Sequence, residues 1–471
     1  MKKILNSGFL GNVIKVSSSN LLVLILGVML TFILPMKLST EGFGYWQLFV
    51  LYTSYCGFFI FGFSDGVNLR YGGYKYEDLD FKLFRTEFKY LIIYTVLVSL
   101  AMILTLLWLF SDNPNLFVYI GFAVNITLFN IQGFFIHICQ ITGKFKQYSI
   151  GISLERILLV TFIVFTLVLP INNYEIYICA DFIARICVIC YFSYNCKEIV
   201  FGQRYNLNKV RDEIITNVKV GFFLMFSAII SMMMSNYIKF FIERNFGIKE
   251  FSYFAFATSM LSLVLQTIVS ISTVLYPMMR RIETVKLKGI YKSLNNILND
   301  ISGILLLAYY VAVFFIIYII PKYSLVLEFL MILFPVILFN IKNNMLITLF
   351  YKVFRLEKQI FYNNIIGLGL MMILTSVGFY FSKTIGIVVV AYLLSYFLIT
   401  IYTERKLFKI NNWNNDNRNN MTYIIIIFIA INYFIPTPTN LLIYCPVSII
   451  IFGLHAKRIL KEVKFLGKLL K

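Results

Sequence analysis

The stretch Leu38–Leu48, LSTEGFGYWQL, lies between two long apolar runs near the start of the chain. It carries a single charge, Ser39 and Thr40 are residues that cap helices, and its two glycines permit a tight turn. Tyr45 and Trp46 are aromatic residues of the kind enriched at membrane–water interfaces. The stretch therefore predicts a short turn between two membrane-spanning helices.

Parts of this pattern return in the second half of the chain. Phe43–Tyr45 corresponds to Phe251–Tyr253, about 208 residues later. Lys146–Gln147 corresponds to Lys358–Gln359, about 212 residues later, and both of these pairs precede apolar runs. Two matches at nearly one offset predict a duplicated bundle of helices. Because each half would contain an even number of spans, the axis relating them would run along the membrane normal.

The composition settles the class of protein. Hydrophobic residues make up 60% of the chain, aromatic residues 18% and charged residues only 14%, whereas soluble domains are about 45–50% apolar. The net charge of +20 comes from lysines and arginines dispersed among short loops, which indicates contact with anionic lipid headgroups and no nucleic-acid partner. Three of the seven cysteines, Cys179, Cys187 and Cys190, lie in one apolar run and are interpreted as small core residues, with no disulfide framework and no metal site.

Apolar segments of spanning length fall into two sets of six, and two further segments follow an Asn-rich linker at 411–420. We expect an all-α polytopic membrane protein with about 14 transmembrane helices, forming two pseudo-symmetric six-helix lobes and two additional C-terminal helices. The predicted divisions are 1–212 for the N-terminal lobe, 213–410 for the C-terminal lobe, and 411–471 for the linker, the last two helices and a basic tail. The predicted segments are 16–36, 45–64, 90–110, 117–139, 149–169, 174–194, 217–242, 251–276, 301–320, 325–350, 360–381, 385–402, 423–435 and 441–455.

Basic residues test this count and orient the chain. Lysine and arginine accumulate in alternate loops, roughly thirty on one side against about five on the other, and the positive-inside rule places the richer side in the cytoplasm. Both termini are therefore expected in the cytoplasm.

Motifs of catalysis are missing from the sequence. It has no P-loop, dinucleotide-binding glycine motif, HExxH or nucleophile elbow in a usable context. The two histidines, His137 and His455, lie near predicted helix ends, where a hydrogen-bonded interfacial histidine is the ordinary case. The predicted external loops are short, which counts against a polysaccharide polymerase or ligase. We therefore expect a transporter without its own ATPase, with no catalytic residue and no cofactor.

Candidate functional residues are the charged groups inside predicted spans, because each costs about 2.5–3.5 kcal/mol at a helix centre. One interpretation is structural: the i,i+4 pairs Asp181–Arg185 and Lys239–Glu243 neutralise themselves, while Arg156 and Lys342 extend to the cytoplasmic surface. The alternative interpretation is functional, with these groups facing a cargo. The charged groups in question are Glu155, Arg156, Asp181, Arg185, Lys239, Glu243 and Lys342.

Several ordered segments resemble the Wzx-type polysaccharide flippases, in the superfamily that also contains the MATE drug exporters and the lipid II flippases. They are the LSTEGFGYWQL turn, FGFSDGVNLRYGG, TGKFKQYSIGISLERI and NVKVGFFLMFSAIISMMMSNYIKFFIERNFGIKEFSYF. Many relatives carry an acidic residue in the seventh helix, whereas this chain has Ser235 and Asn236 followed by Lys239. An ion-coupling role for that helix is therefore in doubt.

The resemblance implies a flippase of the bacterial inner membrane that moves a polyprenyl-diphosphate-linked oligosaccharide to the outer leaflet for O-antigen or capsule synthesis. Its partners would be that lipid-linked substrate, the phospholipid bilayer, and a polysaccharide polymerase with its chain-length machinery. A MATE-type multidrug exporter is the alternative, and its cavity would need acidic residues for a cationic cargo. The expected cationic cavity comprises Arg185, Arg156, Arg70, Lys239 and Lys342, and the expected ion- or proton-coupling residues are Asp181, Glu155 and Glu243.

Overall fold

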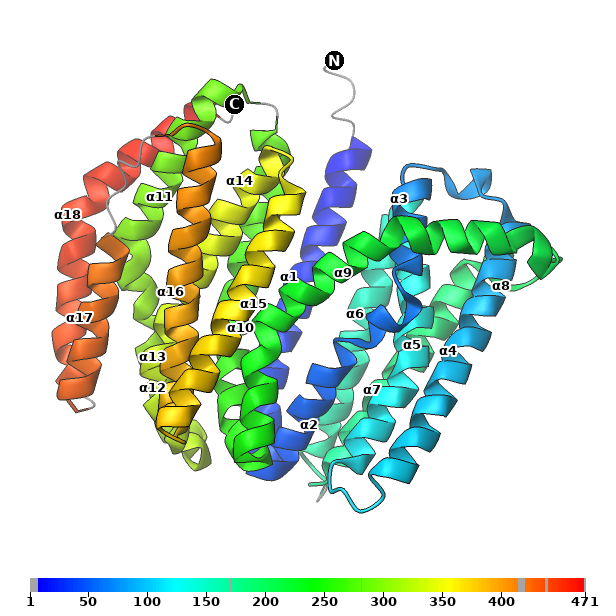
Figure 1. The fold of residues 1–471 in the computed structure, drawn as a ribbon, viewed down its shortest axis with the longest axis horizontal. Coiled ribbons are helices and arrows are strands. Elements are labelled where there is room, and N and C mark those ends of the chain that lie inside the picture. Colours follow the sequence, from blue (N-terminus) through cyan, green and yellow to red (C-terminus); the bar gives the residue numbers. More distant parts are fainter. Residues whose placement is uncertain (1–6, 170–171, 281, 414–419, 437–438, 470–471) are drawn as a thin grey trace. The chain divides into compact units, whose positions relative to one another are not determined.

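The computed structural model describes residues 7–169, 172–280, 282–413, 420–436 and 439–469, which are almost entirely helical (Figure 1). The basic amino end with Lys2 and Lys3, and most of the Asn-rich linker, lie outside the described residues. The chain divides into two compact units, Met1–Met232 and Met233–Lys471. This division falls inside one 40-residue helix, α9 (Leu207–Phe246). The lobe boundaries expected from the sequence, at 212/213 and 410/411, stay predictions.

Unit 1 is a bundle in which α5 packs against α2, α4 and α7, and α6 packs against α1 and α7. The expected turn is present, because the Ser39 hydroxyl accepts a hydrogen bond from the Gly42 amide at 3.0 Å and caps α2. Asp80 caps α4 in the same way, accepting from the amides of Lys82 and Leu83. The helices are α1 (Ser7–Lys37), α2 (Thr40–Thr53), α3 (Phe63–Tyr71), α4 (Phe81–Leu109), α5 (Leu116–Ile141), α6 (Phe145–Thr166), α7 (Tyr174–Asn195), α8 (Lys197–Val200) and the first part of α9.

A break in the second predicted segment positions α3. Phe61 and Gly62 both have positive φ, and the helical stretch Thr40–Ile60 bends by 62° into α3. Gly62 is needed there for a second reason: a Cβ on it would lie 2.6 Å from the backbone of Gly221 in α9. Gly66 is closer still, since its Cβ would lie 1.8 Å from a carbonyl oxygen of α9. Glycines therefore allow α3 and α9 to touch backbone to backbone.

Unit 2 repeats several of these pairings. There α13 packs against α10 and α16, α16 packs against α15, and α11 packs against the last two helices, α17 and α18. Phe379 of α15 packs its ring against Phe241 and Phe246 of α9. The contacts of α13 with α10 and α16 match those of α5 with α2 and α7 in unit 1. The helices are α10 (Ile248–Met279), α11 (Thr284–Leu306), α12 (Ala308–Ile319), α13 (Leu327–Ile341), α14 (Thr348–Val353), α15 (Glu357–Phe381), α16 (Ile385–Ile410), α17 (Asn420–Phe434) and α18 (Thr439–Leu469).

The helices identify a multi-pass membrane protein. Among the described residues, 11 helices are long and apolar enough to cross a membrane, or up to 12 if the bent pair Thr40–Ile60 and Phe63–Tyr71 counts as one span. Two shorter apolar helices, Leu21–Lys37 and Met421–Phe434, coincide with the first and thirteenth predicted segments. That these two also cross the membrane stays a prediction.

One interpretation of the cysteines was wrong. Cys179, Cys187 and Cys190 are exposed on α7 and do not contribute to a core. The reason is that α7 turns a different face inward, with Asp181, Arg185 and Val188 buried.

Candidate functional site

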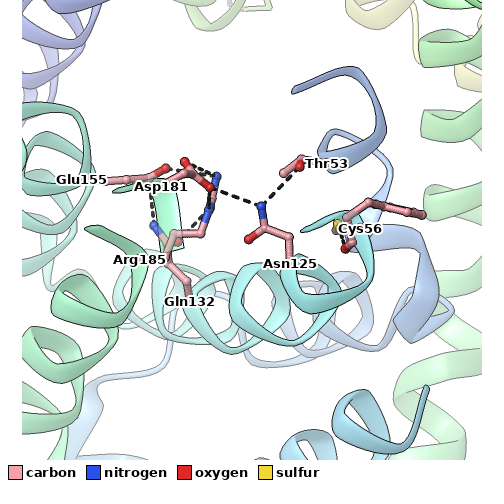
Figure 2. A network of polar contacts seen from close by, with 8 residues as sticks. Thr53, Cys56, Asn125, Gln132, Glu155, Asp181 and Arg185 are labelled. Atoms are coloured by element: carbon pink, nitrogen blue, oxygen red, sulfur yellow. Dashed lines mark hydrogen bonds and ion pairs between the residues drawn. The ribbon is translucent and has the colours of Figure 1, made fainter. Parts of the chain in front are cut away.

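A buried network in unit 1 joins three helices around Arg185 (Figure 2). Arg185 and Asp181 lie one turn apart on α7, and Arg185 Nε donates to Asp181 Oδ2 at 2.8 Å. Glu155 on α6 places its Oε1 3.3 Å from Arg185 Nη2. The Gln132 amide on α5 connects them, because its oxygen accepts from Arg185 Nη1 at 3.0 Å and its nitrogen donates to Glu155 Oε2 at 2.5 Å.

The charge of this network is negative. One guanidinium faces two carboxylates, so the formal sum is −1 when all three groups are ionised. Asp181 is 5% exposed and Arg185 8% exposed, so water screens the imbalance only weakly. The ion pair expected between Asp181 and Arg185 is present, but with Glu155 added the acids outnumber the base, which is the reverse of the balance expected from the sequence.

Neutral side chains complete the network. Asn125 on α5 donates through Nδ2 to Asp181 Oδ2 and to Thr53 Oγ1 of α2, both at 3.2 Å (Figure 2). Its own Oδ1 is buried and accepts no hydrogen bond. Sequence analysis missed Gln132 and Asn125, since an uncharged amide in an apolar helix gives no signal on its own until packing brings charges to it.

Arg156 behaves differently from Arg185. It is half-buried on α6 beside Glu155, and no hydrogen bond or ion pair joins its guanidinium to another described residue. Since adjacent helical residues point in different directions, Arg156 does not join the closed network.

Arg70 belongs to a second network, where α3 and α4 meet the first part of α9. Its Nη2 lies 2.6 Å from Glu213 Oε1, and its Nη1 donates to Asn217 Oδ1 at 2.6 Å. Asn217 Nδ2 in turn donates to Glu87 Oε1 at 2.9 Å. Glu87 is 1% exposed, and its Oε2 accepts no hydrogen bond. The two carboxylates were missed because they lie outside the apolar runs.

Lys342 is paired inside unit 2. It opens a π-helical segment, Lys342–Ile347, and its Nζ lies 2.8 Å from Glu404 Oε2 of α16. Tyr291 of α11 donates to the other oxygen, Glu404 Oε1, at 2.8 Å. At 3% exposure Lys342 does not extend to the membrane surface, so that interpretation was wrong. The extra residue of a π turn changes which side chains face the bundle, and Glu404 follows the apolar run that identified its helix.

Lys239 lines a partly open cavity of about 240 Å³, whose other lining residues lie on α9, α10, α13, α16 and the π-helical segment Lys342–Ile347. Glu243, one turn further along α9, is half-buried and is not among the residues that line this cavity. Across the described residues, no cluster of three or more His, Cys, Asp or Glu side chains could hold a metal ion.

Comparison with solved structures identifies the fold of the chain. No protein-family model and no curated protein matches the sequence. Among solved structures, an inward-closed lipid II flippase, MurJ, superposes with a TM-score of 0.64 at 14% identity, covering 98% of this chain and all of that one. The chain has the fold of MOP-superfamily transporters. An inward-facing MATE multidrug-resistance transporter of that superfamily matches with a TM-score of 0.54 at 11% identity, over 83% of this chain and 99% of that one.

A MATE transporter from Vibrio cholerae gives a TM-score of 0.54 at 12% identity, over 88% of this chain and all of that one. All three matched structures are transporters by their descriptions. Identities of 11–14% establish the fold alone, so cargo has to be argued from the residues.

Proposed function

We propose that the protein is a flippase that moves a polyprenyl-diphosphate-linked oligosaccharide from the cytoplasmic to the outer leaflet of a bacterial inner membrane, for O-antigen or capsule synthesis. The two units would act as pseudo-symmetric six-helix lobes and expose the cargo to each side in turn. The recurring helix pairings of α5 and α13 support the repeat. Both termini would be cytoplasmic, as the distribution of basic residues predicts.

The observation that carries this proposal is the extent of the match to a lipid II flippase. The superposition covers 98% of this chain, so it includes most of α17 and α18. The two MATE structures are themselves covered almost completely, yet match only 83% and 88% of this chain. The flippase therefore matches more of this chain than either MATE structure does, and this difference favours a lipid-linked cargo.

The charged residues support the proposal unequally. Arg156 and Lys239 form no hydrogen bond or ion pair with another described residue, so an anionic cargo could reach them without displacing a carboxylate. Arg70, Arg185 and Lys342 each already face a carboxylate. For these three, binding a diphosphate would require the phosphate oxygens to replace carboxylate oxygens, and Arg is better suited than Lys to that two-pronged exchange.

Energy coupling is proposed at the Arg185 network. Asp181 and Glu155 are the acidic groups of this network, so we propose that they take up a coupling proton or a monovalent cation. Glu243 remains a further proposed coupling residue.

A MATE-type drug exporter is the second candidate, and the acid excess around Arg185 is the observation that favours it. A cationic cargo would be attracted to that network. The two candidates therefore differ in the charge of what they carry.

Deletion of the gene followed by analysis of lipid-linked oligosaccharides tests the function. A flippase predicts loss of surface polymer and accumulation of the lipid-linked repeat unit on the cytoplasmic leaflet, with both restored by the wild-type gene. Unpolymerised repeat units at the outer face would point to a polymerase instead. Unchanged surface polymer together with new sensitivity to cationic drugs would support the exporter and refute the flippase.

A further inference from the structure

The cavity beside Lys239 has many polar side chains in its wall. Nine of the 13 residues that line it carry a hydroxyl, amide or ammonium group. All 13 lining residues belong to unit 2. The polar residues lining it are Ser235, Asn236, Lys239, Thr258, Ser262, Asn340, Asn344, Tyr392 and Tyr396.

Hydrogen bonds among the lining residues hold the wall in place. The Tyr396 hydroxyl interacts with the side chains of Ser235, Asn340 and Tyr392, and Asn344 Nδ2 donates to Asn340 Oδ1. Tyr392 and Tyr396 pack edge to face, with ring centroids 5.0 Å apart. Both tyrosines are buried, so the aromatic wall is preorganised.

Among the described residues that line the cavity, Lys239 is the only charged one, and none of the described residues forms a hydrogen bond or ion pair with its ammonium group. A charged side chain inside a membrane span is expected to meet a counter-charge. Because none of the described residues supplies one, the geometry leaves one cationic position for an anion to fill.

We propose that this cavity binds an acidic sugar residue, with Lys239 contacting its carboxylate and the amides and hydroxyls of the wall contacting its ring hydroxyls. The proposal rests on the proposed function, because it identifies part of the oligosaccharide cargo. A volume of about 240 Å³ lies below the ~300–1,000 Å³ of pockets for drug-sized ligands, which suits one sugar ring. The tyrosine pair offers the aromatic surface on which the apolar face of such a ring packs.

The single ammonium group of the cavity also fits an acidic sugar better than it fits the diphosphate of the lipid carrier. A diphosphate carries more than one negative charge and is usually held by several cations or by bidentate arginines. One lysine among neutral amides and hydroxyls matches a single carboxylate among hydroxyls.

The test measures binding of small probes to the purified full-length protein in detergent, by saturation-transfer NMR and by thermal stabilisation. The probes are glucuronate, glucose and inorganic pyrophosphate. We expect glucuronate to bind at least about 10-fold more tightly than either of the others, since it alone supplies both the charge and the hydroxyls. Equal binding of glucose and glucuronate, preferential binding of pyrophosphate, or no detectable binding of glucuronate would overturn the proposal.

Two variants test whether glucuronate binds in this cavity. Lys239→Gln keeps a hydrogen-bonding side chain but removes the charge, and it should weaken glucuronate binding about 10-fold or more while leaving glucose unchanged. Lys383→Gln, in the exposed loop between α15 and α16, is the matched control and should bind like wild type. Unchanged glucuronate binding by Lys239→Gln would refute the site. Should that variant fail to fold, the wild-type ranking of the three probes still decides.

The result is separable from the proposed function. If deletion abolishes surface polymer but the wild-type polymer contains no acidic sugar, the flippase proposal stands and the cavity proposal fails. If glucuronate binds at Lys239 but deletion leaves lipid-linked oligosaccharides unchanged, the flippase proposal fails on its own.

Discussion

Replacing Arg185 by alanine should destabilise unit 1 strongly, and the structure gives the size of the effect. The substitution leaves the Asp181 and Glu155 carboxylates buried without their shared cation. It also removes the donor to the Gln132 oxygen. Loss of one partner from a buried ion pair costs about 3–5 kcal/mol. For a unit of this size, that corresponds to a fall of roughly 6–20 °C in the melting temperature.

The assay is the fraction of purified protein that stays monodisperse in detergent after heating, compared across matched variants. Arg156→Ala is the control, because it removes an arginine on α6 that forms no hydrogen bond or ion pair with a described residue, and its melting temperature should stay close to that of wild type. Glu155→Gln removes a negative charge but keeps a side-chain oxygen that can accept from Gln132 or face Arg185, so it should cost much less than Arg185→Ala.

The order of the melting temperatures of these variants tests whether the Arg185 network stabilises unit 1. Equal melting temperatures for Arg185→Ala and Arg156→Ala would mean that the network contributes little to stability. Function then separates the two arginines: Arg156→Ala should reduce surface polymer at normal protein levels, whereas Arg185→Ala should reduce it together with the amount of folded protein. Full surface polymer with Arg156→Ala would remove Arg156 from the proposed cargo path.

Three further predictions follow from topology and packing. A cysteine introduced at Asn113 should react with a membrane-impermeant thiol reagent from outside in a background without native cysteines, and one at Asn206 should not; the opposite pattern would reverse the predicted orientation. Gly66→Ala should cost at least the ~1–3 kcal/mol of overpacking, since its Cβ would lie 1.8 Å from a backbone oxygen of α9, whereas Gly369→Ala, with nothing within 4 Å, should leave the melting temperature unchanged. Lys342→Met should lower the melting temperature by several degrees by stranding its carboxylate partner, and neutralising that partner as well should restore part of the loss.

The fold was largely predictable from the sequence because long apolar runs can satisfy their backbone groups in lipid only as helices. Each predicted segment overlaps one or more helices, and the cap at Ser39 formed as expected. The bend at Phe61–Gly62 was not predicted, because the apolar run continues through it without interruption. Its cause is a contact with α9, more than 150 residues further along the chain, which local pattern does not reveal.

The candidate sites were predictable only where both partners lie on one helix. The i,i+4 spacing of Asp181 and Arg185 predicted their ion pair, and the structure confirms it. Glu155 completes the network through packing of α6 on α7, and Glu404 reaches Lys342 from another helix, so neither partnership could be derived from spacing. The burial of a lysine likewise depends on the helices packed around it, which is why the interpretation that Lys342 extends to the surface was wrong.

The two units differ in the sign of the charge that their buried polar sites leave uncompensated. The network around Arg185 in unit 1 has two carboxylates for one cation, whereas the cavity beside Lys239 in unit 2 has one cation and no carboxylate. Under the proposals made here, unit 1 takes up the proton or cation and unit 2 takes up the anionic sugar. Two variants test this division of roles. Glu155→Gln should change the pH dependence of surface-polymer export without altering glucuronate binding, and Lys239→Gln should do the reverse. If either variant changes both properties equally, the two sites do not have separate roles.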